Sequence, residues 1–152
     1  MDLQRLDDLK IVVVDDQEDV RSAVGRFLSD MGAQVQVCKN VDEVLDVVPK
    51  LQLDLIISDI RMPGKDGFEL LNAIRCLERD FGREVPIIAM SAYELEIEEK
   101  LGNSPGFNGF LQKPFTPDVL MQAISDVLRV ASGILGKFPR VADKNRTMRW
   151  PS

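Results

Sequence analysis

The chain has 152 residues, 45% of them hydrophobic, and this length and composition are those of one globular domain. Its formal net charge of −6 argues against nucleic acid as a direct partner, because phosphate backbones bind basic surfaces. The chain contains no histidine, which excludes a histidine-based catalytic triad, a histidine-ligated zinc ion and a phosphohistidine on this chain.

Short apolar runs alternate with amphipathic segments from the start of the chain. The run Ile11–Val14 is too short for a helix and rich in β-branched residues, so it predicts a buried strand. Apolar residues at helical spacing over residues 20–31 predict a helix that ends at Gly32. The alternation of Val35 and Val37 with glutamines predicts a second strand.

The same alternation continues through the middle of the chain. The segment Val41–Val48 predicts a short helix closed by Pro49, because proline disrupts a helix interior. The segment Leu53–Ser58 predicts a third strand, and apolar residues at helical spacing over residues 68–77 predict a third helix.

Two further strands and two further helices follow. Val85–Met90 predicts a fourth strand, Glu94–Leu101 a weakly patterned fourth helix, and Phe110–Leu111 the start of a fifth strand. Apolar residues over positions 119–131 predict a last helix. Five strands, each followed by a helix, indicate an α/β fold with a parallel sheet covered by helices on both faces.

The periodic pattern ends after residue 132, and the charge changes sign there. Residues 1–132 carry 14 basic and 24 acidic side chains, whereas residues 133–152 carry five basic and one acidic. We therefore expect a domain at residues 1–132 and a basic C-terminal tail or linker at residues 133–152. The charges of this tail are either solvated or available to a partner.

The sequence also indicates a compartment. No apolar run approaches the roughly 20 residues that span a membrane, and the N-terminal segment has no apolar signal core. Cys38 and Cys76 are expected to be buried, reduced thiols, because they lie in apolar-patterned segments without a paired spacing. A cytoplasmic protein that does not contact a membrane is the simplest interpretation.

Polar side chains follow four of the predicted strands, at the edge where parallel α/β sheets bind ligands. They are Asp15 and Asp16 after the first strand, Asp59 after the third, Ser91 after the fourth and Lys113 after the fifth. Two carboxylates about 4 Å apart repel each other by roughly 4 kcal/mol at an effective dielectric near 20, so three of them require a cation or raised pKa values. Oxygen ligands alone favour Mg²⁺, and Lys113 and Ser91 would donate to a phosphate-like anion beside it. The set indicates phosphoryl transfer to a carboxylate nucleophile.

Four motifs in order resemble the receiver domain of bacterial two-component response regulators. They are Val12–Asp16, Ser58–Gly67, Met90–Ala92 and Leu111–Phe115. Each motif alone is weak, but all four in order, each closing a strand, are specific, and the resemblance covers residues 10–131. It implies a doubly wound, flavodoxin-like (βα)5 sheet with strand order 2-1-3-4-5 in a single domain.

The resemblance also implies roles for the clustered side chains. Asp59 would be the phosphoacceptor. Asp15, Asp16 and Asp59 would form the Mg²⁺ site, with Asp16 and the backbone carbonyl of Arg61 as direct ligands. Lys113 would pair with the phosphoryl oxygens.

Further roles concern the response to phosphorylation. The resemblance implies that Ser91 hydrogen-bonds the phosphoryl group and moves on phosphorylation, that Phe110 changes rotamer between states, and that the Lys113–Pro114 peptide bond is cis. We expect Arg61 and Tyr93, two residues beyond the acceptor and the hydroxyl, to flank the path of a hydrolytic water and to prolong the phosphorylated state.

Simpler interpretations exist for each residue. Asp15 and Asp16 could cap the first helix, and Asp59 could begin a turn with Pro63 and Gly64. The remaining alternatives are a solvated side chain at Lys113, a core side chain at Phe110 and a strand-end hydroxyl at Ser91.

The leading hypothesis is a signalling module that receives a phosphoryl group from a histidine kinase or histidine phosphotransfer protein and catalyses only its own phosphorylation and dephosphorylation. Its downstream partner would be an output protein or a second copy of the chain. A Mg²⁺-dependent phosphohydrolase with an aspartate nucleophile is the alternative, but Arg61 stands where such enzymes carry a second aspartate. A degenerate, unphosphorylated module is disfavoured by the intact site. The chain could be a stand-alone regulator, a phosphorelay shuttle or part of a longer protein.

Overall fold

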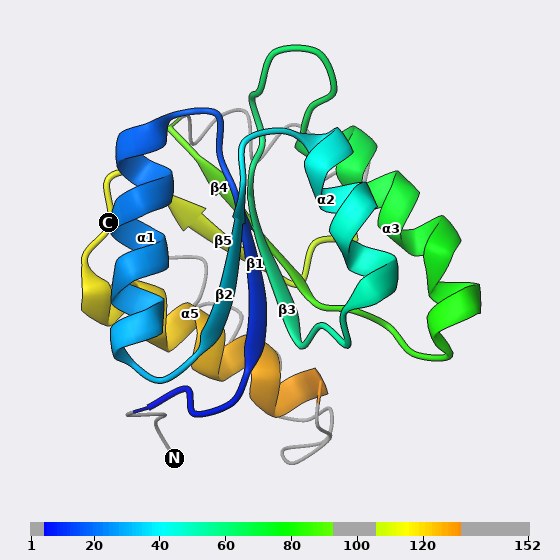
Figure 1. Ribbon diagram of the computed structural model, residues 1–152. Helices are drawn as coiled ribbons and strands as arrows, with labels where there is room; N and C mark the ends of the chain where they lie inside the picture. The colour runs from blue at the N-terminus through cyan, green and yellow to red at the C-terminus, as the bar shows by residue number, and fades with distance from the viewer. Residues whose placement is uncertain (1–4, 93–105, 132–152) are drawn as a thin grey trace.

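The computed structural model describes residues 5–92 and 106–131, so the predicted helix at Glu94–Leu101 and the tail at 133–152 lie outside the described residues. The elements are β1 (Lys10–Val14), α1 (Glu18–Asp30), β2 (Gln34–Cys38), α2 (Val41–Val47), the 3-10 helix η1 (Val48–Lys50), β3 (Leu55–Asp59), α3 (Gly67–Phe81), β4 (Ile87–Ser91), β5 (Gly109–Gln112) and α5 (Pro117–Ala131). Figure 1 shows them arranged in three layers.

The strands form one parallel sheet in the order β2-β1-β3-β4-β5. Helices α1 and α5 cover one face, and α2 and α3 cover the other (Figure 1). This arrangement confirms the predicted doubly wound fold and strand order. In the part of the chain that the structure describes, no helix is long and apolar enough to cross a membrane.

The interior strand β1 contributes to both hydrophobic cores. Ile11 and Val13 pack with α1 and α5, whereas Val12 and Val14 pack with α2 and α3. All four are almost completely buried. A strand that is buried on both faces has no polar side to its pattern, which explains the unbroken apolar run in the sequence.

Helix α3 begins at a capping box next to the site. The Glu69 amide donates to Asp66 Oδ1 at 2.9 Å, and the Asp66 amide donates to Glu69 Oε1 at 3.2 Å. The helix ends at Gly82, whose φ of 75° is the left-handed conformation that glycine adopts at low cost. The capping box fixes where the loop after β3 ends, and Gly82 fixes where the chain turns back toward the sheet.

The side chain of Arg75 on α3 joins three segments that are far apart in sequence. Its Nη1 donates to Glu78 and to the Val85 carbonyl at 2.8 Å. Its Nη2 donates to the Gly106 carbonyl at 2.7 Å and to Asn108 Oδ1 at 2.9 Å. The guanidinium therefore holds the starts of β4 and β5 against α3.

Several local predictions differ from the structure. Strand β3 begins at Leu55 rather than Leu53, and β4 spans Ile87–Ser91 rather than Val85–Met90. Helix α2 ends at Val47, before Pro49 as predicted, and Pro49 lies within the 3-10 helix η1 that follows, where its fixed φ is tolerated. Cys76 is exposed on α3, whereas Cys38 is buried, and burial is the largest cause raising the pKa of its thiol to about 11.

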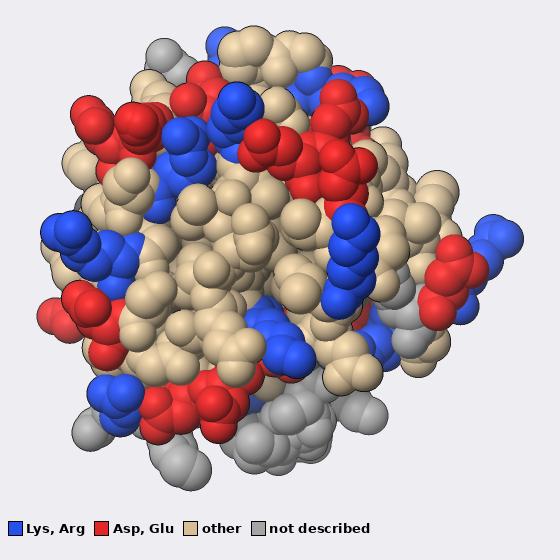
Figure 2. All heavy atoms as spheres, in the orientation of Figure 1, with Lys and Arg blue, Asp and Glu red and all other residues tan. Residues whose placement is uncertain are grey.

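Surface charge is mixed on the face shown in Figure 2. Acidic and basic side chains surround an uncharged centre, and no continuous basic surface is visible on that face. Strand β2, the edge of the sheet beside α1, contains no charged residue within Gln34–Cys38.

Candidate functional site

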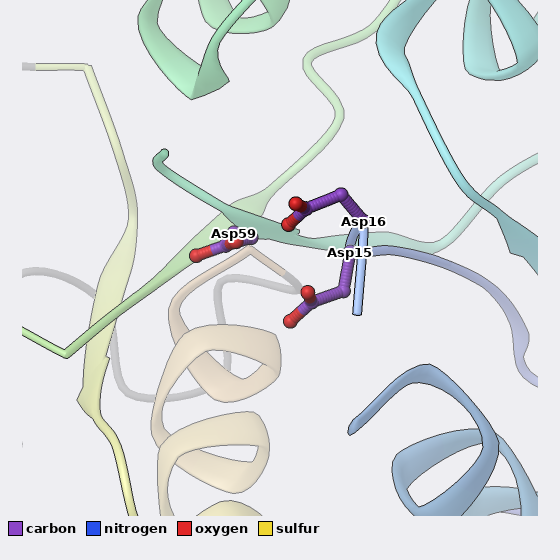
Figure 3. Close-up of side chains that lie close together, drawn as sticks. All are labelled: Asp15, Asp16 and Asp59. Carbon is purple, nitrogen blue, oxygen red and sulfur yellow. The ribbon is translucent and has the colours of Figure 1, made fainter. Parts of the chain in front are cut away.

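The carboxyl ends of β1 and β3 bring three aspartates together. The two strands are neighbours, with Val14 opposite Ser58. The next residue of each chain segment, Asp15 and Asp59, therefore lies at the same edge of the sheet. Each of Asp15, Asp16 and Asp59 offers a carboxylate oxygen, and these oxygens lie within 4.8 Å of one another. Figure 3 shows the three side chains converging at this edge.

Lys113 reaches this cluster from the end of β5. Its Nζ donates to Asp15 Oδ2 at 2.7 Å and lies 3.4 Å from Asp59 Oδ1. The lysine side chain is only 15% exposed, so it is not the solvated lysine of the simpler interpretation. The Lys113 amide donates to the Ser91 carbonyl at 2.7 Å, and the Lys113–Pro114 bond is cis as predicted.

Asp15 is fixed by several hydrogen bonds. Its Oδ1 accepts from the Gln17 amide at 2.9 Å, its Oδ2 accepts from Lys113, and its carbonyl accepts from Arg21 Nη1 at 2.8 Å. Gln17 is the N-cap residue of α1 and makes no side-chain cap, so neither aspartate caps that helix. With both carboxylate oxygens of Asp15 engaged, the exposed Asp16 is better placed to bind an ion directly.

Asp59 is the last residue of β3 and is only 6% exposed. Burial is the largest cause raising the pKa of its carboxyl to about 7. The nearby charge of Asp15 raises this pKa further, and Lys113 opposes the shift. A buried carboxylate beside a second one is destabilised in its charged form until a cation neutralises it.

The chain after Asp59 returns close to the end of β3 before α3 begins. The Gly67 amide donates to the Ile60 carbonyl at 2.8 Å, and a Cβ at Gly67 would lie 2.7 Å from the Asp59 carbonyl oxygen. Glycine at position 67 therefore permits the close return of the chain into α3.

The remaining predicted site residues lie around this centre. Ser91 is the last residue of β4 and is 2% exposed, whereas Arg61 is exposed on the loop after β3. Phe110 is buried on β5 at 8% exposure, and Tyr93 lies outside the described residues.

Sequence reasoning missed the residues that support the aspartates. Arg21 holds the Asp15 carbonyl, Gln17 holds its side chain, and Ser58 Oγ donates to the Asp59 carbonyl at 2.9 Å. Ser58 and Gly67 lie inside the motif that resembles the receiver domain, but nothing in the pattern distinguished Arg21 or Gln17 from ordinary surface residues.

Comparison with protein families identifies this arrangement. The response regulator receiver domain family matches residues 11–125. The chain belongs to this family. It is therefore a receiver domain of two-component and phosphorelay signalling, and a phosphohydrolase is not favoured.

Curated relatives of this receiver domain differ in overall length. An uncharacterized 14.6 kDa protein of Leptolyngbya boryana is 37% identical over 80% of this chain and 92% of its own. The sensor histidine kinase RcsC of Salmonella typhimurium is 33% identical over 78% of this chain, but the match spans only 12% of RcsC. Receiver sequences of this kind thus occur both as short proteins and within much longer ones.

Solved structures have the same fold. The chemotaxis response regulator CheY4 of Vibrio cholerae is 31% identical, with a TM-score of 0.72, covering 80% of this chain and 99% of CheY4. The response regulator TrrA of Thermotoga maritima, solved in complex with Mg²⁺ and BeF, is 29% identical, with a TM-score of 0.69, covering 79% of this chain and 99% of TrrA.

Proposed function

We propose that Asp59 accepts a phosphoryl group from the phosphohistidine of a histidine kinase or histidine phosphotransfer protein. The observation that carries this proposal is the buried Asp59 carboxylate, with Asp15 and Asp16 within 4.8 Å and the Lys113 ammonium 3.4 Å away. One carboxylate for attack, two for a cation and one ammonium for the transferred anion are the parts that phosphoryl transfer requires.

The donor set fits Mg²⁺. The clustered side chains offer only carboxylate oxygens, which suit a hard divalent ion, and the raised pKa of Asp59 reflects a burial and repulsion that such an ion would offset. Asp16, Asp59 and the backbone carbonyl of Arg61 would hold the ion, and Asp15 would complete the acidic site around it. Bound there, Mg²⁺ would neutralise the carboxylates and the oxygens of the incoming phosphoryl group. The complex of TrrA with Mg²⁺ and BeF supports this assignment.

The chain's own residues would then carry the transfer. A carboxylate oxygen of Asp59 attacks the phosphorus in line with the donor's P–N bond. That bond breaks as the new O–P bond forms, and the imidazole leaves with a proton from solvent. Lys113, which now pairs with Asp15 and Asp59, would bind a phosphoryl oxygen, and the Ser91 hydroxyl would donate to another.

The phosphate donor would dock beside the site. A cavity of about 650 Å³ lies between α1 and the β5–α5 connection, next to Lys113. Its apolar lining includes Val20, Phe27, Phe115 and Leu120, which suits a helical partner presenting a phosphohistidine. The phosphorylated receiver would act on an output protein or on a second copy of the chain.

A direct labelling experiment tests the proposed function. Acetyl phosphate with Mg²⁺ should add one phosphoryl group to the native protein, since small acyl phosphates can replace the kinase donor. The adduct should be removed by hydroxylamine, which cleaves acyl phosphates but not phosphate esters of serine or tyrosine. Intact-mass spectrometry measures both steps, and chelation of Mg²⁺ should prevent labelling. A hydroxylamine-resistant adduct would contradict an aspartyl phosphate.

We further propose that Arg61 and Tyr93 prolong the phosphorylated state. Hydrolysis requires a water in line with the O–P bond, and neither side chain is a carboxylate or amide that would orient one. Arg61→Asn and Tyr93→Ala should each speed loss of the phosphoryl group, because a tenfold change needs only about 1.4 kcal/mol of barrier. The measurement is the decay of labelled protein after removal of acetyl phosphate. Equal decay rates in the native protein, both variants and the double variant would show that no shielding exists.

A further inference from the structure

Three phenylalanine rings form a row from α3 to β5. The Phe68 and Phe107 ring centroids are 5.4 Å apart with planes at 69°, and those of Phe107 and Phe110 are 6.0 Å apart at 75°. Both pairs have the edge-to-face geometry in which the positive edge of one ring meets the negative face of the next. We call these three residues the phenylalanine row.

The last ring of the row packs against the residue that follows the acceptor Asp59. Phe110 is 8% exposed and shares a cluster with Ile60 and Ala89. Ile60 directly follows Asp59, and its amide donates to the Met90 carbonyl at 2.9 Å. Ala89 lies opposite Phe110 on the neighbouring strand, and its small side chain leaves space for the ring. The buried position of Phe110 therefore supports the backbone next to Asp59.

The middle ring, Phe107, is held in place from both sides. The preceding carbonyl, of Gly106, accepts from Arg75, and the following amide, of Asn108, donates to the Ile87 carbonyl at 2.8 Å. Phe107 also packs against both the α2–α3 core and the cluster around Phe110. The Phe110 ring therefore packs against a side chain whose backbone is held on both sides.

We propose that Phe107 is a positioning residue that holds the Phe110 ring against Ile60 and thereby fixes the backbone beside Asp59, where the phosphoryl group binds. This inference rests on the proposed function. A phenylalanine ring has no hydroxyl to anchor it, so the position of Phe110 depends on packing alone. Loss of the Phe107 ring would free Phe110 to move away from Ile60 and would loosen the backbone next to Asp59.

The test is the binding of beryllofluoride, a mimic of the phosphoryl group on aspartate, in the presence of Mg²⁺. Phe107→Ala should weaken binding by about 2-fold to about 10-fold, the range expected for one edge-to-face contact. Phe107→Leu, which keeps an apolar side chain without the ring, should show a smaller loss. Leu128→Ala is the matched control on α5, where Leu128 packs against the opposite core, and it should bind like the native protein.

A double-mutant cycle separates positioning from general destabilisation. In a Phe110→Ala background, Phe107→Ala should cause no further loss, because the ring it positions is gone. The NMR signal of the Ala89 methyl should also move in Phe107→Ala as the Phe110 ring leaves it. Unchanged binding in Phe107→Ala, or an equal loss in both backgrounds, would overturn the inference. If Phe107→Ala does not fold, Phe107→Leu is used in the same cycle.

The outcomes also distinguish this inference from the proposed function. A native protein that acetyl phosphate does not label would overturn both. Normal labelling of the native protein, together with unaltered beryllofluoride binding in the Phe107 variants, would overturn only the role of Phe107.

Discussion

Replacing Asp59 with asparagine should abolish phosphorylation while leaving the fold intact. Asparagine has nearly the same shape, but its neutral amide oxygen cannot attack phosphorus to give a stable product, so no acyl phosphate forms. Asp59 lies at the end of a fully buried strand, and its burial and its repulsion from Asp15 together outweigh its attraction to Lys113, so removing the charge does not destabilise the fold. Mass spectrometry after acetyl phosphate treatment should show no added phosphoryl group in this variant.

Asp66→Asn is the matched control for this prediction. Asp66 lies at the end of the loop that follows Asp59 and caps α3, a role that asparagine fulfils equally well. The control should therefore fold and be labelled like the native protein. Labelling of Asp59→Asn to the native extent would mean that the acceptor lies elsewhere, whereas loss of labelling in both variants would point to a general disturbance of the loop.

The second large effect concerns the stability of the metal-free protein as a function of pH. The pKa of Asp59 is raised from 3.8 to about 7 in the folded state, so between these pH values the folded protein holds a proton that the unfolded chain has released. Stability should therefore fall as pH rises through this window and stay low above about pH 7. The difference between the two pKa values corresponds to up to about 4 kcal/mol.

Asp59→Asn removes this titration. At pH 8 the metal-free variant should be more stable than the native protein by roughly 2–4 kcal/mol, and near pH 4 the two should be almost equal. Urea unfolding at both pH values, with chelator present, measures the difference. Asp54→Asn is a control at the opposite end of the sheet and should not reproduce the pH-dependent gain. A constant difference between native protein and Asp59→Asn across this range would refute the raised pKa.

Mg²⁺ should offset much of the stability that the native protein loses above pH 7. At a concentration one hundred times its Kd, an ion bound only to the folded state adds about 2.7 kcal/mol. The native protein should gain this stability at pH 8. Asp16→Asn should gain much less, because the variant lacks the exposed carboxylate that would bind the ion directly. A full Mg²⁺ response in Asp16→Asn would remove Asp16 from the ion's ligands.

Much of the fold and the site could be predicted because two strong patterns coincide. Strands buried on both faces leave unbroken apolar runs such as Ile11–Val14, and parallel strands place their carboxyl ends at one edge. Asp15, Asp59 and Lys113 therefore meet, although the sequence separates them widely. The cis Lys113–Pro114 bond was predicted through the family resemblance and is confirmed.

What could not be predicted depends on tertiary contacts. The sequence does not show that Lys113 lies closer to Asp15 than to Asp59, because this depends on the paths of two side chains across the sheet. The sequence does not show that Cys76 faces solvent, because the apolar pattern of α3 does not define how far around the helix the buried face extends. Arg75 resembles any surface arginine until the loops that it binds are in place.

The hydrogen bonds of Arg75 also have a consequence for how the molecule opens. The amides of Val85 and Ile87 donate to Glu78 and Asn108, the two side chains that Arg75 binds. Neither amide can exchange with solvent by fraying of a single loop while the guanidinium holds all these segments together. The α3–β4–β5 portion should therefore exchange its amide hydrogens as one cooperative unit, with its opening governed by the partly buried side chain of Arg75.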